Sequence, residues 1–231
     1  MPDGLRAAAA GLAAQQARLD AIANDVANVG TTGYKSTRVA FRDLVGGAGA
    51  AATDAGRSFQ PGPITPSDNP LAVAITGPGF LQVKLPDGRT GLTRSGDLRL
   101  DANRDLVTTS GLRIQPPIKL PAGVDADDLR IDRDGNVAAG TTRIGQLQVV
   151  DVPARAGLLS VGDGVYVTTA ASGAAARVAS PELQQNALEG SNVDVGSAMV
   201  DMIDAQRSFQ LASQALKMQD ELRNIANQIK R

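Results

Sequence analysis

Residues 197–231 read SAMVDMIDAQRSFQLASQALKMQDELRNIANQIKR, a stretch that reaches the last residue of the sequence without a glycine or a proline. Apolar residues recur every seven positions in it and just before it, at Val195, Met202, Phe209 and Leu216. This spacing is typical of a helix with one narrow apolar seam. The helix would be about 50 Å long at ~1.5 Å per residue, longer than a compact domain of this size requires. We expect Ser191 or Asn192 to cap its N-terminus, with Asp194 in the first turn.

The beginning of the chain carries a second seam of the same kind. Its members are spaced by seven or offset by three, with Gln15 as the polar exception: Leu5, Ala8, Leu12, Leu19, Ile22, Val26 and Val29. Gly30 and Gly33 are expected to end this helix, because glycine commonly terminates helices. Each seam must be buried, and two helices can cover one another side by side. Ile203 and Leu211 would still lie outside the seam, so we expect helices from other copies to cover them.

The middle of the chain, residues 67–188, has the periodicity of strands. Apolar residues alternate in residues 71–75 and 79–85, and short strand-like runs continue to about residue 169. Turn signals such as Asp87-Gly88 separate these runs. Short strands with frequent turns favour an antiparallel sandwich or barrel-like body.

The expected fold class is therefore α+β, with long N- and C-terminal helices forming a coiled-coil-like bundle and a central antiparallel all-β domain. Four segments follow: an N-terminal assembly helix and connector over 1–45, a flexible Gly/Ala/Pro-rich segment over 46–66, a β domain over 67–188 and a C-terminal assembly helix over 189–231. Helices at opposite ends, each with a seam to bury, indicate assembly through the termini.

Composition excludes several kinds of site. The chain has no cysteine and no histidine, which removes disulfides, thiolate metal sites and the commonest general base. A net charge of −1 and an aromatic content of 3% provide no basic field or stacking surface for nucleic acid. The first residues do not have the pattern of a cleavable signal peptide. We expect no catalytic residue, cofactor, metal or nucleic acid, and no direct membrane insertion, because long apolar stretches are missing.

Two other functional classes stay open. A pair of carboxylates could make the chain an enzyme acting on the cell wall, although no convincing pair is apparent among its acids. The β domain could also serve as a binding module. Residues 132–136, DRDGN, hint at a calcium loop but lack its far glutamate, and a hairpin turn explains them more simply.

The chain resembles the flagellar basal-body rod and hook proteins. Residues 23–35, ANDVANVGTTGYK, are similar to the family's N-terminal signature A-N-N-L-A-N-x-x-T-x-G-Y-K. Residues 188–195, LEGSNVDV, and 199–209, MVDMIDAQRSF, are similar to its C-terminal signature. Between them, GFLQV at 79–83 and LTRSG at 92–96 follow the family's central pattern. The likeness covers nearly the whole chain and is strongest to distal-rod members, with a proximal rod position as the alternative.

The resemblance implies a non-enzymatic structural subunit of the flagellar rod, which transmits torque to the hook. It implies export through the flagellar type III apparatus without a cleavable signal peptide, helical stacking with copies of itself, and contacts with other rod proteins and the hook protein. The implied location is the basal body, in the periplasm or cell-wall zone. Asn24 and Asn28, four apart on one helix face, would either bond neighbouring helices or be solvated. The expected assembly residues are Leu5, Leu12, Leu19, Ile22, Asn24, Val26, Asn28, Gly33, Tyr34, Ser191, Asn192, Val195, Met202, Ile203, Gln206, Phe209 and Leu216.

Overall fold

The computed structural model describes residues 3–43 and 50–229. Contacts between residues divide the chain into two compact units, a helical unit and a β unit. The helical unit comprises the described parts of Met1–Ala27, Thr37–Arg57 and Asp194–Arg231. The β unit comprises Asn28–Ser36 and Ser58–Val193. No described helix combines the length and apolarity that crossing a membrane requires.

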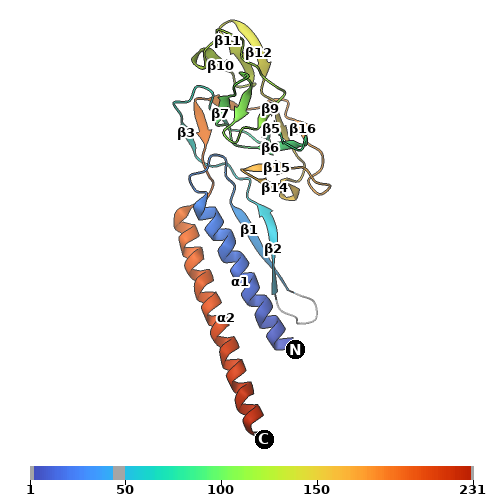
Figure 1. Cartoon of the computed structure of the whole chain (residues 1–231), viewed down its shortest axis with the longest axis vertical. Helices are drawn as coiled ribbons and strands as arrows, with labels where there is room; N and C mark the ends of the chain where they lie inside the picture. The colour runs from blue at the N-terminus through green and yellow to red at the C-terminus, as the bar shows by residue number, and fades with distance from the viewer. Residues whose placement is uncertain (1–2, 44–49, 230–231) are drawn as a thin grey trace. The chain divides into compact units, whose positions relative to one another are not determined.

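The helical unit contains the two helices that the seven-residue spacings predict. Helix α1 (Asp3–Ala27) lies beside α2 (Val195–Ile229), and α1 also packs against the antiparallel strands β1 (Thr37–Asp43) and β2 (Ala50–Arg57) (Figure 1). The carboxylate of Asp25, near the end of α1, accepts the backbone N–H of Thr37 at 3.0 Å and so fixes the start of β1.

The expected coiled-coil-like bundle is wrong. A bundle buries its seams between helices, whereas here α1 divides its surface between a single helix and a two-stranded sheet. Among the described apolar side chains of the two helices, only Ala14 and Ala205 are buried, and Ala14 lies outside the predicted seam. The seven-residue spacing identified an apolar face correctly, but it carries no information about which element covers that face.

The segment predicted to be flexible, 46–66, includes all of β2 and of β3 (Ile64–Pro66), while residues 44–49 lie outside the described residues. The bounds of the four predicted segments stay a prediction. Each of the two units consists of separate stretches of the chain, because residues on either side of β1 and β2 belong to the β unit while the two strands belong to the helical unit.

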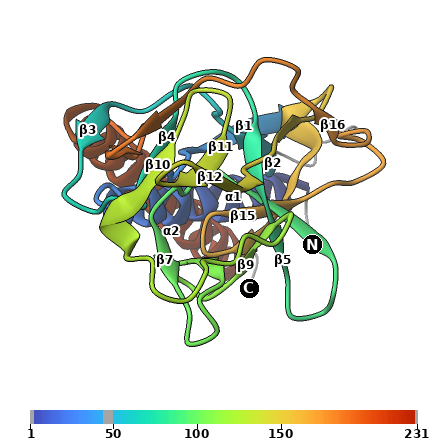
Figure 2. The same cartoon turned by 90° about the horizontal axis from the view of Figure 1, so that it is seen from above.

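The β unit is built from short antiparallel strands, as predicted, and the α+β class is correct. Its largest sheet has the order β14-β15-β6-β5-β9-β8-β7, with β13 pairing both β5 and β16. Figure 2 labels β15, β5, β9 and β7 of this sheet. The strands of this sheet are β5 (Phe80–Lys84), β6 (Thr90–Thr93), β7 (Leu98–Leu100), β8 (Leu106–Thr108), β9 (Arg113–Gln115), β13 (Val149–Asp151), β14 (Leu159–Gly162), β15 (Val165–Val167) and β16 (Ala176–Arg177).

Among the described residues, three smaller sheets complete the β unit. One of them is the three-stranded sheet β10-β11-β12, formed by Leu129–Ile131, Asn136–Ala139 and Thr142–Gln146. In the other two, β17 (Leu183–Gln185) pairs with β4 (Val73–Ile75), and β18 (Ala187–Glu189) pairs with β3. These last two pairings bring the residues that precede α2 back onto strands from the first third of the chain.

Two apolar clusters form the core of the β unit. The larger includes Val73, Leu81, Ile114 and Leu147, all fully buried. In the smaller, the rings of Phe59, Phe80 and Tyr166 meet edge to face at centroid distances of 5.2–6.2 Å. Burial of each large side chain contributes about 1.5–3 kcal/mol, so these clusters hold the sheets together independently of polar contacts.

Candidate functional site

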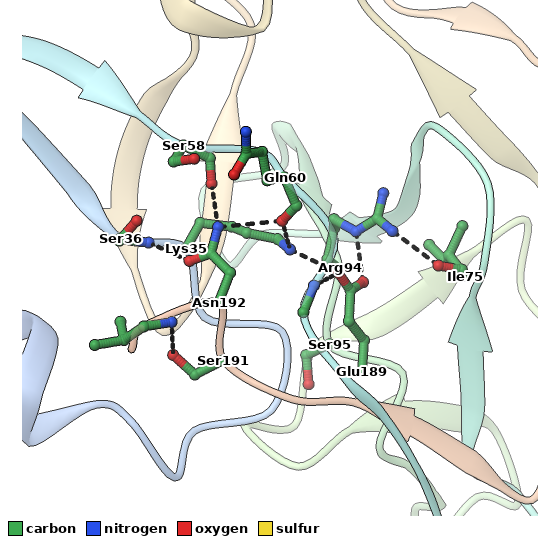
Figure 3. A network of polar contacts seen from close by, with 12 residues as sticks. Lys35, Ser36, Ser58, Gln60, Ile75, Arg94, Ser95, Glu189, Ser191 and Asn192 are labelled. Carbon is green, nitrogen blue, oxygen red and sulfur yellow. Dashed lines mark hydrogen bonds and ion pairs between the residues drawn. The ribbon is translucent and has the colours of Figure 1, made fainter. Parts of the chain in front are cut away.

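Three charged side chains meet in the interior of the β unit, and we call them the charge hub (Figure 3). Lys35 Nζ lies 2.6 Å from Glu189 Oε1, and Arg94 Nε lies 2.6 Å from Glu189 Oε2. The side chains of Lys35 and Glu189 are 0% exposed and that of Arg94 is 3% exposed. Each oxygen of one carboxylate therefore binds a different buried cation.

Arg94 is held firmly by the backbone around it. Its guanidinium donates to the carbonyl oxygens of Ile75 at 2.8 Å, Gly79 at 2.9 Å and Gly77 at 3.2 Å. These carbonyls belong to β4 and to the turn that leads into β5. Because the planar guanidinium presents its donors in a fixed fork, this set of acceptors orients the Nε–H toward Glu189.

Lys35 bonds a backbone carbonyl as well as the carboxylate. Its ammonium donates to the carbonyl of Gln60 at 2.7 Å in addition to Glu189. Burial lowers the pKa of Lys35 below its usual value of 10.5; the hydrogen bond and the charge of Glu189 oppose this shift, and the positive charge of Arg94 adds to it. The hub holds two cations against one carboxylate, and burying charge is costly even when it is paired.

Asn192 links the same chain segments through its amide. The backbone N–H of Ser36 donates to its Oδ1 at 2.8 Å, and its Nδ2 donates to the carbonyls of Ser58 at 2.7 Å and Gln60 at 3.1 Å. The backbone of Gly33 also donates to the carbonyl of Glu189 at 2.7 Å. Residues 189–192 thus lie between residues 33–36 and 58–60 and bond to both.

Close backbone approach makes glycine necessary beside the hub. Gly33 has φ +69°, and a Cβ there would lie 2.7 Å from the carbonyl carbon of Arg94. A Cβ on Gly62 would lie 2.2 Å from the carbonyl oxygen of Gly190. Gly33 was expected to help end the first helix, and the structure adds a steric reason for glycine at this position.

Several of the expected assembly residues lie in the helical unit. Asn24, Ile203 and Gln206 are exposed, and the side chain of Leu5 in α1 lies outside the described residues. The half-buried members are Leu12, Leu19, Ile22, Val26, Val195, Met202, Phe209 and Leu216. The structure therefore gathers the seam members on the less exposed sides of α1 and α2.

The remaining expected residues lie in the β unit. Gly33, Tyr34 and Ser191 are buried, and Asn192 is part of the network around the hub. Asn28 accepts the backbone N–H and the hydroxyl of Thr31 at 3.0 Å and 3.2 Å, which turns the chain after α1. The assembly role of all these residues stays a prediction.

The predicted cap of the C-terminal helix is wrong. Asp194, rather than Ser191 or Asn192, directly precedes α2, and its carboxylate accepts the N–H groups of Gly196 at 3.2 Å and Ser197 at 3.3 Å. The hydroxyl of Ser197 also donates to it, and these hydrogen bonds hold the pKa of Asp194 below its usual value. Asn192 does not cap because its amide bonds the β unit.

Sequence reasoning also missed Lys35, Arg94 and Glu189 as a site. All three were part of signature stretches, but none was assigned a role. One feature of the sequence could have indicated this site: each of three short signatures contains a charged residue and few other charges. These side chains meet across separations of 95 and 154 positions in the sequence, which no local pattern predicts.

A second feature of interest is a line of exposed apolar residues on α2, which we call the outer stripe. Its members are 48–67% exposed: Met199, Val200, Ile203, Leu211, Met218, Leu222 and Ile225. At roughly 100° per residue, Val200, Leu211, Met218, Leu222 and Ile225 fall on the side of α2 opposite the half-buried seam of Met202 and Phe209, and Met199 and Ile203 lie between the two sides. Asp204, Arg207 and Gln214 lie among them. Helix α2 is therefore apolar on two opposite sides.

Comparison with known proteins finds similarity along the whole chain. The family model "Flagella basal body rod protein" matches residues 5–35, "Flagellar hook protein FlgE/F/G D1 domain" matches 74–139, and "Flagellar basal body rod FlgEFG protein C-terminal" matches 184–229. Each matched stretch contributes one residue of the charge hub: Lys35, Arg94 and Glu189 respectively.

Full-length relatives agree with these matches. The flagellar basal-body rod protein FlgG of Borreliella burgdorferi is 34% identical over 264 aligned positions, which cover 100% of both chains. That of Agrobacterium fabrum is 34% identical over 258 positions, covering 96% of this chain and 97% of its own. The flagellar basal-body rod protein FlgF of Salmonella typhimurium is 30% identical over 244 positions, covering 96% of each chain.

Proposed function

This chain belongs to the flagellar basal-body rod protein family, and from that premise we propose that it is a subunit of the distal rod that polymerises through α1 and α2. Family membership makes it a structural component of the flagellar basal body and not an enzyme. The proposal concerns its position in the rod and the surfaces through which it assembles.

The outer stripe is the observation that carries the proposal. Large apolar side chains at 48–67% exposure remain in contact with water in a single copy, and covering them is favourable by roughly 25 cal/mol per Å². Contiguous exposed apolar surface of this kind is typical of interaction sites. A helix with apolar faces on opposite sides fits a position between two partners, with α1 on one side and a helix of another copy on the other.

The proposed partners follow from the family. We expect a helical homopolymer that contacts other rod proteins and the hook protein, after export through the flagellar type III apparatus without a cleavable signal. The polymer would lie in the periplasm or cell-wall zone, and assembly would involve neither nucleic acid nor insertion of the chain into a membrane. The seam residues of α1 and α2, together with Ile203 and Gln206, would form the subunit contacts.

A proximal position in the same rod is the second candidate. It is favoured by the similarity to a rod protein with a different name, FlgF, at 30% identity over 96% of both chains. When the subunit is missing, the length of rod that remains differs between the two positions, because a rod grows outward from its base.

Deletion of the gene, followed by electron microscopy of purified basal bodies, tests the proposal. We expect a rod that stops before the hook, with a long remaining stub for a distal subunit and a short stub for a proximal one. Complete and motile flagella in the deletion strain would contradict both positions. Re-expression of the wild-type chain in the same strain is the control.

A further inference from the structure

Polar contacts attach residues 28–36 to the rest of the β unit. Gly33, Lys35 and Ser36 bond Glu189 or Asn192 directly, and the backbone N–H of Asn192 donates to the carbonyl of Tyr34 at 3.3 Å. The N–H of Ser58 donates to the carbonyl of Ser36 at 2.9 Å. Residues 189–192 therefore take part in most of these hydrogen bonds.

Neither side of this attachment contributes a residue to the two apolar core clusters. The residues of the two core clusters and those packed against them lie within residues 59–183. Residues 28–36 and 187–193 both fall outside that range. Separation of these two segments would leave the packing of the core clusters intact, so the free energy that opposes it comes mainly from the polar contacts and the burial of Tyr34.

The charge of Glu189 is the central contribution to the attachment. Its two oxygens neutralise two buried cations that otherwise repel one another. Arg94 keeps three carbonyl acceptors on β4 and the turn into β5 without Glu189. An uncompensated buried charge is strongly unfavourable, so Lys35, on the segment that connects α1 to β1, is the cation that leaves for water.

We infer that Glu189 acts as a latch for residues 28–36: loss of its negative charge releases this segment while the core strands β5, β6 and β9 stay folded. The segment connects α1 to β1 in the sequence. Whether this connection is held in place therefore depends on a residue that lies 154 positions beyond Lys35. The β unit thus has a closed form and a form opened at one place.

Hydrogen exchange of the full-length Glu189→Gln variant tests this inference. The change removes the charge and keeps nearly the same shape. We expect the amides of Gly33, Ser36 and Asn192 to exchange roughly a hundredfold faster or more, since a buried pair is broken. The amides of the β5–β6 ladder should exchange as in the wild type. The matched control is Glu182→Gln, the same change at an exposed position in the same unit.

Unchanged protection of Gly33 and Ser36 in the variant would overturn the inference, because the charge would then not hold the segment. Equal loss of protection throughout the β unit would overturn it too, since Glu189 would then support the whole fold. If the variant does not fold, exchange of the wild type in low denaturant decides. Residues 33–36 and 189–192 must open together at a lower free energy than the core, and opening only with global unfolding contradicts the latch.

Discussion

Lys35 and Glu189 are 154 positions apart, yet Lys35 Nζ lies 2.6 Å from Glu189 Oε1 with both side chains at 0% exposure. The pair joins the segment that follows α1 to the strand that precedes α2, so both ends of the β unit are tied at one point. Arg94, from the middle of the chain, completes the same cluster. Three signature stretches of the family therefore share one physical role in the β unit.

The first prediction concerns the fork geometry of Arg94. Lysine at this position keeps the positive charge but cannot reach the carbonyls of Ile75, Gly77 and Gly79 together. We expect Arg94→Lys to lower the free energy of unfolding of the β unit by about 1.5–3 kcal/mol. Tyrosine emission measures this directly, because both tyrosines, Tyr34 and Tyr166, belong to the β unit and the chain has no tryptophan.

The control for this change is Arg130→Lys, at an exposed position of the same unit. It should shift the free energy of unfolding by no more than about 0.5 kcal/mol. Equal stabilities of the Arg94 and Arg130 variants would mean that charge alone matters at the hub.

The second prediction separates backbone strain from lack of space at Gly33. Gly33 and Gly111 both have positive φ, +69° and +82°, but a Cβ would meet the backbone of Arg94 at 2.7 Å in the first and nothing within 4 Å in the second. Gly111→Ala should cost about 1–2 kcal/mol from strain alone. Gly33→Ala should cost clearly more in denaturant unfolding. A Gly33 variant as stable as the Gly111 variant would show that the connector moves away freely.

The third prediction is a pH dependence caused by Lys35. Its pKa in the folded protein lies below its usual value of 10.5 because the side chain is buried. Between the folded pKa and 10.5, the unfolded chain binds more protons than the folded one, so stability rises with pH in that window. Relative to Lys35→Met, which cannot titrate, the wild type should gain stability as the pH increases toward 10.5.

Denaturant midpoints of the wild type and Lys35→Met, measured in steps from about pH 7 to pH 10, check this slope. A difference between the two proteins that does not change with pH would mean that Lys35 titrates no differently in the folded and unfolded chains. A stability difference that falls with rising pH would contradict the prediction, because the pKa of Lys35 would then be higher in the folded chain than in the unfolded chain.

The fourth prediction concerns the start of α2. Asp194 accepts the N–H groups of Gly196 and Ser197, which otherwise lack helical partners. Asp194→Ala should increase hydrogen exchange in the first turn of α2 and reduce helical circular dichroism slightly. In the wild type the same change should appear as the pH falls below the usual carboxyl pKa of 3.8, because the pKa of Asp194 is lowered by these hydrogen bonds. Asp204→Ala, at an exposed position within α2, is the control.

The fifth prediction tests the outer stripe. A charge in a surface that becomes buried on assembly is strongly unfavourable, so Ile203→Asp and Leu211→Asp should prevent rod formation and motility. Both residues are exposed, at 48% and 67%, and the purified variants should keep wild-type circular dichroism. Gln210→Asp, also exposed but about 100° around α2 from Leu211, should affect assembly less. Normal motility of the Ile203 and Leu211 variants would exclude the stripe as a subunit contact.

Local patterns in the sequence were sufficient for the two helices, the antiparallel strands and the family. The lack of glycine and proline after Ser197 and the seven-residue spacing of Met202 and Phe209 act within a few turns of one helix, and turn residues act within a hairpin. Such signals do not depend on the rest of the molecule, which is why the α+β class could be predicted from them.

Only the tertiary structure decided what covers those elements and which charges meet. The spacing in α1 indicated an apolar face, but the pairing of β1 with β2 placed a sheet where a bundle was expected. Asn192 was one of the two predicted caps of the C-terminal helix, but its amide bonds Ser36 and Ser58 instead. Lys35, Arg94 and Glu189 meet only because β18 pairs with β3 and β17 with β4. Contacts over such separations are selected by the packing of the whole β unit, and no local sequence pattern contains them.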